Sequence, residues 1–146
     1  MTTSNLNRFL HTHIPLSAHM GMKVLALEAG RVQIHLPRAR NLNPHGTVFG
    51  GALTALGLVS GWSLVYSAFE RAGVPTKLVG QRSECEFLAP ATGDCSSETC
   101  CDEKELQALI KRFRDGGKAR IELATSIRVG NIEVARHQGV YAALPE

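Results

Sequence analysis

The stretch from Asn43 to Gly51 gathers residue types that can act together on a carbonyl group. It reads N-P-H-G-T-V-F-G-G, so an amide, an imidazole and a hydroxyl side chain precede two adjacent glycines. If a helix begins at these glycines, its first N–H groups are free and the positive end of its dipole faces a bound oxygen. Glycine also leaves room for a carbonyl to approach. The pattern predicts a site that stabilises a developing oxyanion.

Each of these residues also has a purely structural interpretation. Gly50 and Gly51 can serve only to bring a helix close to a sheet. Asn43 precedes a proline and is then a common turn starter. His45 titrates near neutral pH and could act as a base, or it could hydrogen-bond only within its loop. Thr47 is expected mainly to cap the following helix. The residue types alone leave these alternatives open.

A long run without charged side chains follows this loop. Residues 48–69 include no Asp, Glu, Lys or Arg, and Glu70, Arg71, Gly73 and Pro75 then end the run. The pattern predicts a helix over residues 51–72 that is either buried or crosses a membrane. Four glycines, three serines and a threonine dilute its hydrophobicity, and strand-like segments flank it. We therefore expect a buried central helix, with a membrane span as the alternative.

The rest of the chain alternates between strand and helix patterns. Turn signals at Ala29-Gly30 and Gly130-Asn131 predict two hairpins. The expected strands are 22–28, 31–36, 76–88, 94–101, 118–129 and 132–144, with helices starting at Ser4 and over 103–113. These elements predict an α+β fold, in which an antiparallel sheet of about six strands wraps around one long central helix. We expect residues 1–146 to form a single domain.

Composition excludes several other classes of protein. The net charge is +3 and the basic residues are scattered, so no nucleic-acid partner is expected. The N-terminal residues lack the pattern of a secretory signal. The four cysteines, at positions 85, 95, 100 and 101, do not have the spacing of a zinc site. We expect a cytoplasmic protein with no metal site.

Several short motifs resemble those of a known family. They are I-P-L at residues 14–16, Met20-Gly21, H-G-T followed by F-G-G at residues 45–51, and Gly61-Trp62. With the long charge-free helix, they resemble hot-dog-fold acyl-CoA thioesterases. The chain is most similar to the thioesterase-like family that also forms the C-terminal part of some bacterial acetyltransferase-like proteins. The specific part of the resemblance is Asn43 to Leu53.

The resemblance implies a homodimer or a dimer of dimers, with the site at a subunit interface near the start of the central helix. No bound cofactor is implied, because coenzyme A or phosphopantetheine enters only as part of the substrate. The catalytic candidates are then the Gly50 and Gly51 amides for the oxyanion, Asn43 to orient a water, and His45. Further residues are expected to contact the substrate: Thr47, Phe49, Gln81 and Ser83.

One feature departs from the better-understood thioesterases of this fold. Those enzymes carry an acidic residue on the central helix at the position that Leu58 occupies here. Glu84, on the strand after the helix, is the remaining carboxylate candidate, and its alternative role is a solvated edge charge.

Three functions therefore remain. The leading hypothesis is hydrolysis of an acyl-CoA or acyl-carrier-protein thioester. The absence of a carboxylate at Leu58 favours the first alternative, a non-catalytic acyl-thioester binding or sensing module. A hot-dog dehydratase or hydratase is a further alternative, although neither H-F-P-G nor D-x-N-x-x-H occurs in the chain.

Overall fold

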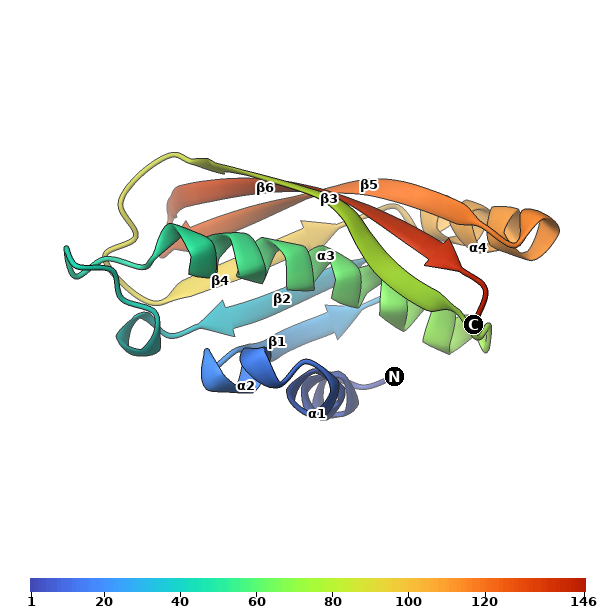
Figure 1. The fold of residues 1–146 in the computed structure, drawn as a ribbon, viewed down its shortest axis with the longest axis horizontal. Coiled ribbons are helices and arrows are strands. Elements are labelled where there is room, and N and C mark those ends of the chain that lie inside the picture. The colour runs from blue at the N-terminus through green and yellow to red at the C-terminus, as the bar shows by residue number, and fades with distance from the viewer.

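The computed structural model describes residues 1–146 and shows a six-stranded antiparallel sheet curled around one long helix (Figure 1). The helices are α1 (Thr3–His13), α2 (Pro15–His19), α3 (Gly50–Ala72) and α4 (Glu103–Gly116), with a short 3-10 turn at Arg38–Arg40. The strands are β1 (Lys23–Glu28), β2 (Arg31–Leu36), β3 (Lys77–Phe87), β4 (Cys95–Cys100), β5 (Ala119–Val129) and β6 (Ile132–Leu144). Their order in the sheet is β1-β2-β4-β5-β6-β3, so β1 and β3 form its two edges. The predicted α+β architecture is confirmed.

The predicted central helix is α3, which lies along the concave face of the sheet (Figure 1). It ends where the sequence indicated, because Gly73 adopts a left-handed conformation (φ 64°) that caps the last turn. By length and composition α3 is the one helix that could cross a membrane, yet 72% of its most apolar window is buried inside the protein. It is therefore the core helix.

Two glycines on α3 allow β6 to approach closely. A Cβ atom at Gly57 would lie 2.4 Å from the Cβ of His137, and one at Gly61 would lie 2.2 Å from the Tyr141 hydroxyl. Both distances are too short for any side chain. The G-x-x-x-G spacing thus serves helix-to-sheet packing, with His137 and Tyr141 lying over the two glycines.

Buried hydroxyl groups join α3 to the middle of the sheet. Ser97 donates a hydrogen bond to Ser60 at 2.9 Å, and the Ser60 and Thr99 hydroxyls are 2.8 Å apart.

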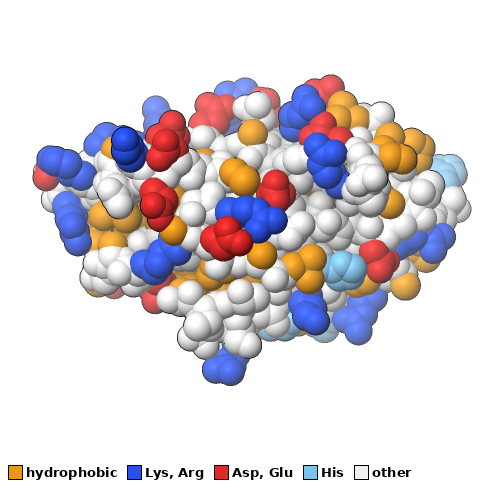
Figure 2. Space-filling model, turned by 180° about the vertical axis from the view of Figure 1, so that it is seen from behind, with side chains coloured by type: hydrophobic (Ala, Val, Ile, Leu, Met, Phe, Trp, Pro, Cys, Tyr) orange, Lys and Arg blue, Asp and Glu red, His pale blue; other side chains and the backbone are white.

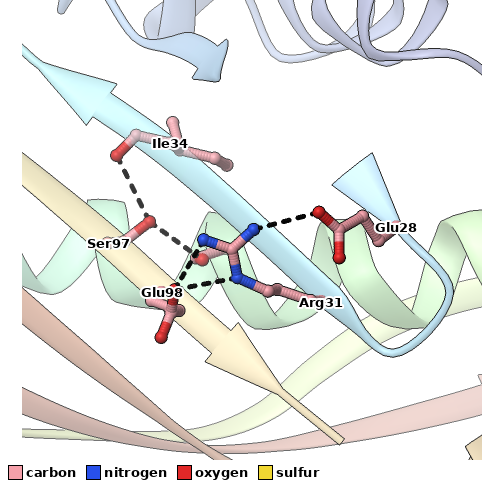
Figure 3. Close-up of polar contacts among 6 residues, drawn as sticks. Glu28, Arg31, Ile34, Ser97 and Glu98 are labelled. Atoms are coloured by element: carbon pink, nitrogen blue, oxygen red, sulfur yellow. Dashed lines mark hydrogen bonds and ion pairs between the residues drawn. The ribbon is translucent and has the colours of Figure 1, made fainter. Parts of the chain in front are cut away.

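On the other face of these strands, Arg31 of β2 pairs with Glu28 and Glu98 (Figure 3). The back of the molecule intersperses positive and negative side chains (Figure 2). This mixed surface agrees with the scattered charges of the sequence.

Two local predictions were wrong. The side chain that caps α1 belongs to Thr2, which accepts a hydrogen bond from Asn5, and Ser4 lies inside the helix. In β3 the alternation of the sequence predicts one face shared by Val79, Gln81, Ser83, Cys85 and Phe87, but a bulge between Gly80 and Arg82 interrupts the alternation. Gly80 therefore faces α3, next to Leu58, and inward positions resume at Ser83 after the bulge.

Candidate functional site

The loop before α3 is organised by the side chain of Asn43. Its amide nitrogen donates to the Thr47 hydroxyl at 2.7 Å. Its oxygen accepts from the backbone N–H groups of His45 and Thr47 at 2.9 and 3.1 Å. Asn43 therefore fills the local role that the sequence allowed for it. One amide hydrogen has no partner within the chain, since the nitrogen makes a single hydrogen bond and carries two hydrogens.

Thr47 does not cap α3, which corrects the prediction made from the sequence. The N-cap residue is Phe49, and no side chain accepts a hydrogen bond from the N–H groups of the first turn. Phe49 is extended (φ −59°, ψ 134°), so the helix begins two residues later than a Thr47 cap requires. The Thr47 hydroxyl is instead bonded to Asn43.

As a result, the first turn of α3 presents unpaired donors. The Ala52 and Leu53 N–H groups bond to the Phe49 carbonyl, whereas the N–H groups of Gly50 and Gly51 make no backbone or side-chain hydrogen bond. They lie at the positive end of a 23-residue helix. This is the arrangement that an oxyanion site requires.

Clefts lie on both sides of this helix start. One has a volume of about 430 Å³ and is lined by Asn43, Thr47, Gly50, Leu53 and Phe87, among others. The other, of about 300 Å³, lies between Gly51, Phe49 and the apolar side chains of Leu16 and Met20. The structure thus brings Asn43, Thr47 and Gly50 to one cleft.

Phe49 covers the second glycine. Its side chain is 57% exposed, and its ring is 2.3 Å from the place where a Cβ of Gly51 would stand. A larger residue at position 51 would therefore displace the Phe49 ring before it filled a carbonyl's place. His45 is exposed, lines neither cleft, and its ring makes no hydrogen bond.

Asn41 is a positioning residue that the sequence analysis missed. Its buried side-chain amide donates to the carbonyls of Met20 and Pro37 at 2.9 and 2.8 Å, and its backbone carbonyl accepts from the Phe49 N–H at 2.8 Å. It therefore ties the loop to α2 and fixes the residue from which α3 starts. The sequence held one sign of this role, because Asn occurs twice in N-L-N at residues 41–43. Only Asn43 has the spacing to the glycine pair that thioesterases of this fold show, so Asn41 was passed over.

The candidates on β3 point in different directions. Glu84 is exposed, stands opposite Gln138 and is ion-paired with Arg82, and neither cleft beside Gly50 includes it. Gln81 sits in the bulge and lines a shallow polar hollow with Arg82 and Arg120.

Ser83, in contrast, points toward the inner face, where its hydroxyl is 2.6 Å from His137 Nε2. The sequence analysis gave His137 no functional role.

His137 is wholly buried, and this burial lowers the pKa of its imidazole below the ordinary value of 6.5. The unfolded chain then binds a proton at a higher pH than the folded chain does. The stability that the neutral ring contributes is present above about pH 6.5 and is lost as the pH falls toward the lowered folded pKa.

We therefore expect the free energy of unfolding to decrease between about pH 7.5 and 5.5, and to decrease less in His137→Gln. Urea unfolding at several pH values measures both slopes. His19→Gln, which alters an exposed histidine that makes no hydrogen bond or ion pair, is the matched control. Equal slopes in His137→Gln and the wild type would show that His137 is not held neutral by folding.

The curled sheet and the α3 helix that it encloses define a hot-dog-fold protein. The chain belongs to the family described as "Putative thioesterase (yiiD_Cterm)", whose model matches residues 3–145. The resemblance predicted from the motifs is confirmed.

Solved structures agree on the fold. A protein of unknown function from Chlorobaculum tepidum TLS superposes with a TM-score of 0.92 at 25% identity, over 99% of this chain and 94% of that one. A protein from Shewanella oneidensis described as a "putative thioesterase" gives 0.85 at 24% identity, over 98% and 97%. A thioesterase from Haemophilus influenzae gives 0.71 at 15% identity, over 99% and 92%.

Proposed function

We propose that this chain hydrolyses acyl thioesters, carried by coenzyme A or by a carrier protein, with the thioester carbonyl at the start of α3. The observation that carries the proposal is the pair of unbonded N–H groups at Gly50 and Gly51. They would hold the carbonyl oxygen as it becomes an oxyanion. The apolar walls of the adjacent clefts suit an acyl chain. The reaction needs no cofactor, and we expect it in the cytoplasm.

The proposal includes a homodimer. Strand β3 pairs with β6 along one edge and leaves its other edge without a partner, although it is 11 residues long. A long unpaired edge is a ready place for a second copy to add its own β3. Such pairing would bring the α3 helices of two subunits together and place the site at their interface.

Non-catalytic binding remains the second candidate, because α3 carries no carboxylate before Glu70 and Glu84 is turned toward Arg82. A panel of acyl-CoAs, assayed for free thiol release and for binding, separates the two functions. Binding with thiol release supports hydrolysis, and binding without release supports the binding module. If no member of the panel binds or reacts, both functions are wrong.

Replacing Asn43 by alanine should lower turnover by at least about tenfold. The variant removes three loop hydrogen bonds and the free amide hydrogen next to the cleft. Steady-state kinetics on the best substrate of the panel measure the effect. Thr47→Val is the companion variant, because it breaks the bond between the two side chains and keeps the Asn43 amide.

Equal losses in the two variants would assign the effect to the bond between the Asn43 and Thr47 side chains, whereas a larger loss in Asn43→Ala would show that Asn43 acts through more than this bond. Unchanged hydrolysis in Asn43→Ala would place the chemistry elsewhere.

A further inference from the structure

A serine and a histidine form a close pair at the open edge of the sheet. Ser83 Oγ of β3 is 2.6 Å from His137 Nε2 of β6, a short distance for a nitrogen–oxygen hydrogen bond. Ser83 is exposed, whereas His137 is 0% exposed. The serine oxygen of the pair is thus accessible to solvent, and the imidazole is buried behind it.

The surroundings of His137 keep the imidazole neutral and in place. Gly57 of α3 lies against the ring, and the register partners of His137 are Thr125 on β5 and Cys85 on β3. The titratable side chains on the same face as His137 are Cys85 of β3 and Tyr141 of β6, and burial raises the pKa of both, so neither is charged at neutral pH. Burial alone lowers the pKa of His137. The ring is therefore uncharged and able to accept a proton at neutral pH.

The second ring nitrogen argues for a role beyond packing. His137 Nδ1 is buried and has no hydrogen-bond partner. Leaving such a group unpaired costs stability, and an apolar residue of similar size would avoid that cost. Because the ring is enclosed, it cannot touch a water or a substrate itself. Its one polar contact is Ser83, so any proton that it takes must come from the serine.

We propose that Ser83 is a catalytic nucleophile and that His137 is its general base; the thioester substrate assigned to the pair rests on the proposed function. Nδ1 of His137 then carries the ring proton, and the lone pair of Nε2 accepts the proton of the serine hydroxyl. Ser83 Oγ bonds to the acyl carbon as the carbon–sulfur bond breaks. The thiolate leaves and takes a proton from solvent, while Nε2 keeps the serine proton.

Water completes the reaction. It bonds to the acyl carbon and loses a proton to solvent, the ester bond to Ser83 breaks, the serine takes its proton back from Nε2 of His137, and the carboxylic acid leaves. Since His137 is enclosed, it cannot activate this water directly. Deacylation should therefore be slower than acylation, and the acyl-serine should accumulate.

The position of the pair fits a site shared between two subunits. Gly57, beside His137, is seven residues beyond Gly50, which is about 10 Å along the helix at 1.5 Å per residue. This spacing separates the pair from the start of its own α3, so we place the carbonyl that Ser83 attacks at the start of α3 of the partner subunit in the proposed homodimer. Gly57, against which His137 packs, directly precedes Leu58, the position where a carboxylate was expected. The pair supplies the proton acceptor that α3 lacks.

Reaction with p-nitrophenyl acetate tests the pair without a thioester. We expect a burst of p-nitrophenolate from the full chain, and peptide mass spectrometry should find one acetyl group on Ser83. Ser83→Ala should abolish that adduct and slow the burst by at least about a hundredfold. Ser96→Ala, which removes a partly buried hydroxyl on β4, is the matched control and should react like the wild type.

His137→Gln should slow acetylation of Ser83 by at least about a hundredfold, while His19→Gln should not. The pH profile of the wild-type burst gives the same information if His137→Gln does not fold. The acylation rate should hold through neutral pH and fall only at a pH below the ordinary imidazole pKa of 6.5, because burial lowers the pKa of His137 and a protonated imidazole cannot accept the serine proton. A flat profile would overturn the role of His137.

Failure of the pair and failure of the proposed function are distinguishable. If Ser83 becomes acetylated but no acyl-CoA is hydrolysed, the nucleophile stands and the thioesterase function is wrong. If acyl-CoAs are hydrolysed but Ser83 stays unlabelled, or Ser83→Ala keeps wild-type turnover, the nucleophile assignment is wrong.

Discussion

Replacing Gly50 with proline should lower the turnover of an acyl-CoA substrate by about a hundredfold to a thousandfold, because it removes a single oxyanion donor. Gly50 is the first residue of α3, a position that accepts proline well. Phe49 before it is already extended (φ −59°, ψ 134°), as the residue before a proline must be. The substitution therefore deletes one N–H group and leaves the helix intact.

Gly50→Ala is the matched control. It adds a Cβ atom that would lie 3.1 Å from the end of the Phe87 ring, as proline also would, but it keeps the N–H group. Steady-state kinetics of both variants, with circular dichroism to verify the helix, isolate the donor. Equal losses in the two variants would assign the effect to crowding against Phe87 and remove Gly50 from the oxyanion site.

Gly57→Val should destabilise the fold by about 3 kcal/mol, the upper part of the range for overpacking a core. A Cβ atom there would stand 2.4 Å from the Cβ of His137, which is fixed to the β6 backbone and cannot swing away. For a chain of this size, the melting temperature should fall by roughly 6–12 °C. Thermal unfolding followed by circular dichroism measures the shift.

The control for that prediction is Gly116→Val. Gly116 is the last residue of α4, and no other atom lies within 4 Å of its missing Cβ. The same substitution should change the melting temperature little there, because valine has a higher helix propensity than glycine. If both variants melt at the same lowered temperature, close packing of α3 on β6 is not what requires Gly57.

The sequence was most informative where one physical rule governs a long segment. The charge-free run of residues 48–69 predicted α3 because a helix that is apolar nearly all round must be buried. Strands β2 and β6 lie at the expected residues, since strict alternation and the Gly130-Asn131 turn set their register. These features are local, so neighbouring residues along the chain contain the necessary information.

The errors arose where distant residues determine a side chain's role. Thr47 was expected to cap α3, but Asn43 binds its hydroxyl and Asn41 holds Phe49 at the helix start. The bulge at Gly80 could not be read from β3 alone, because it depends on the pairing with β6. Both outcomes require knowledge of tertiary contacts.

The pair of Ser83 and His137 was predictable from the sequence only in part. Alternation along β6 places His137 on the same face as Tyr141, so its burial was open to prediction from the sequence. Its contact with Ser83 was not, because 54 residues separate the two and the bulge sets which β3 side chains face inward. The untested site residues, among them His45 and Glu84, remain predictions.

The most direct test of the central claim is a titration with a hydrolysis-resistant acyl-CoA analogue in which a methylene group replaces the thioester sulfur. Amide resonances of the ¹⁵N-labelled protein report which N–H groups bind the ketone oxygen. We predict that the Gly50 and Gly51 amides, which are unbonded in the free protein, shift downfield more than any others. If the analogue binds and these two amides do not move, the carbonyl does not lie at the start of α3.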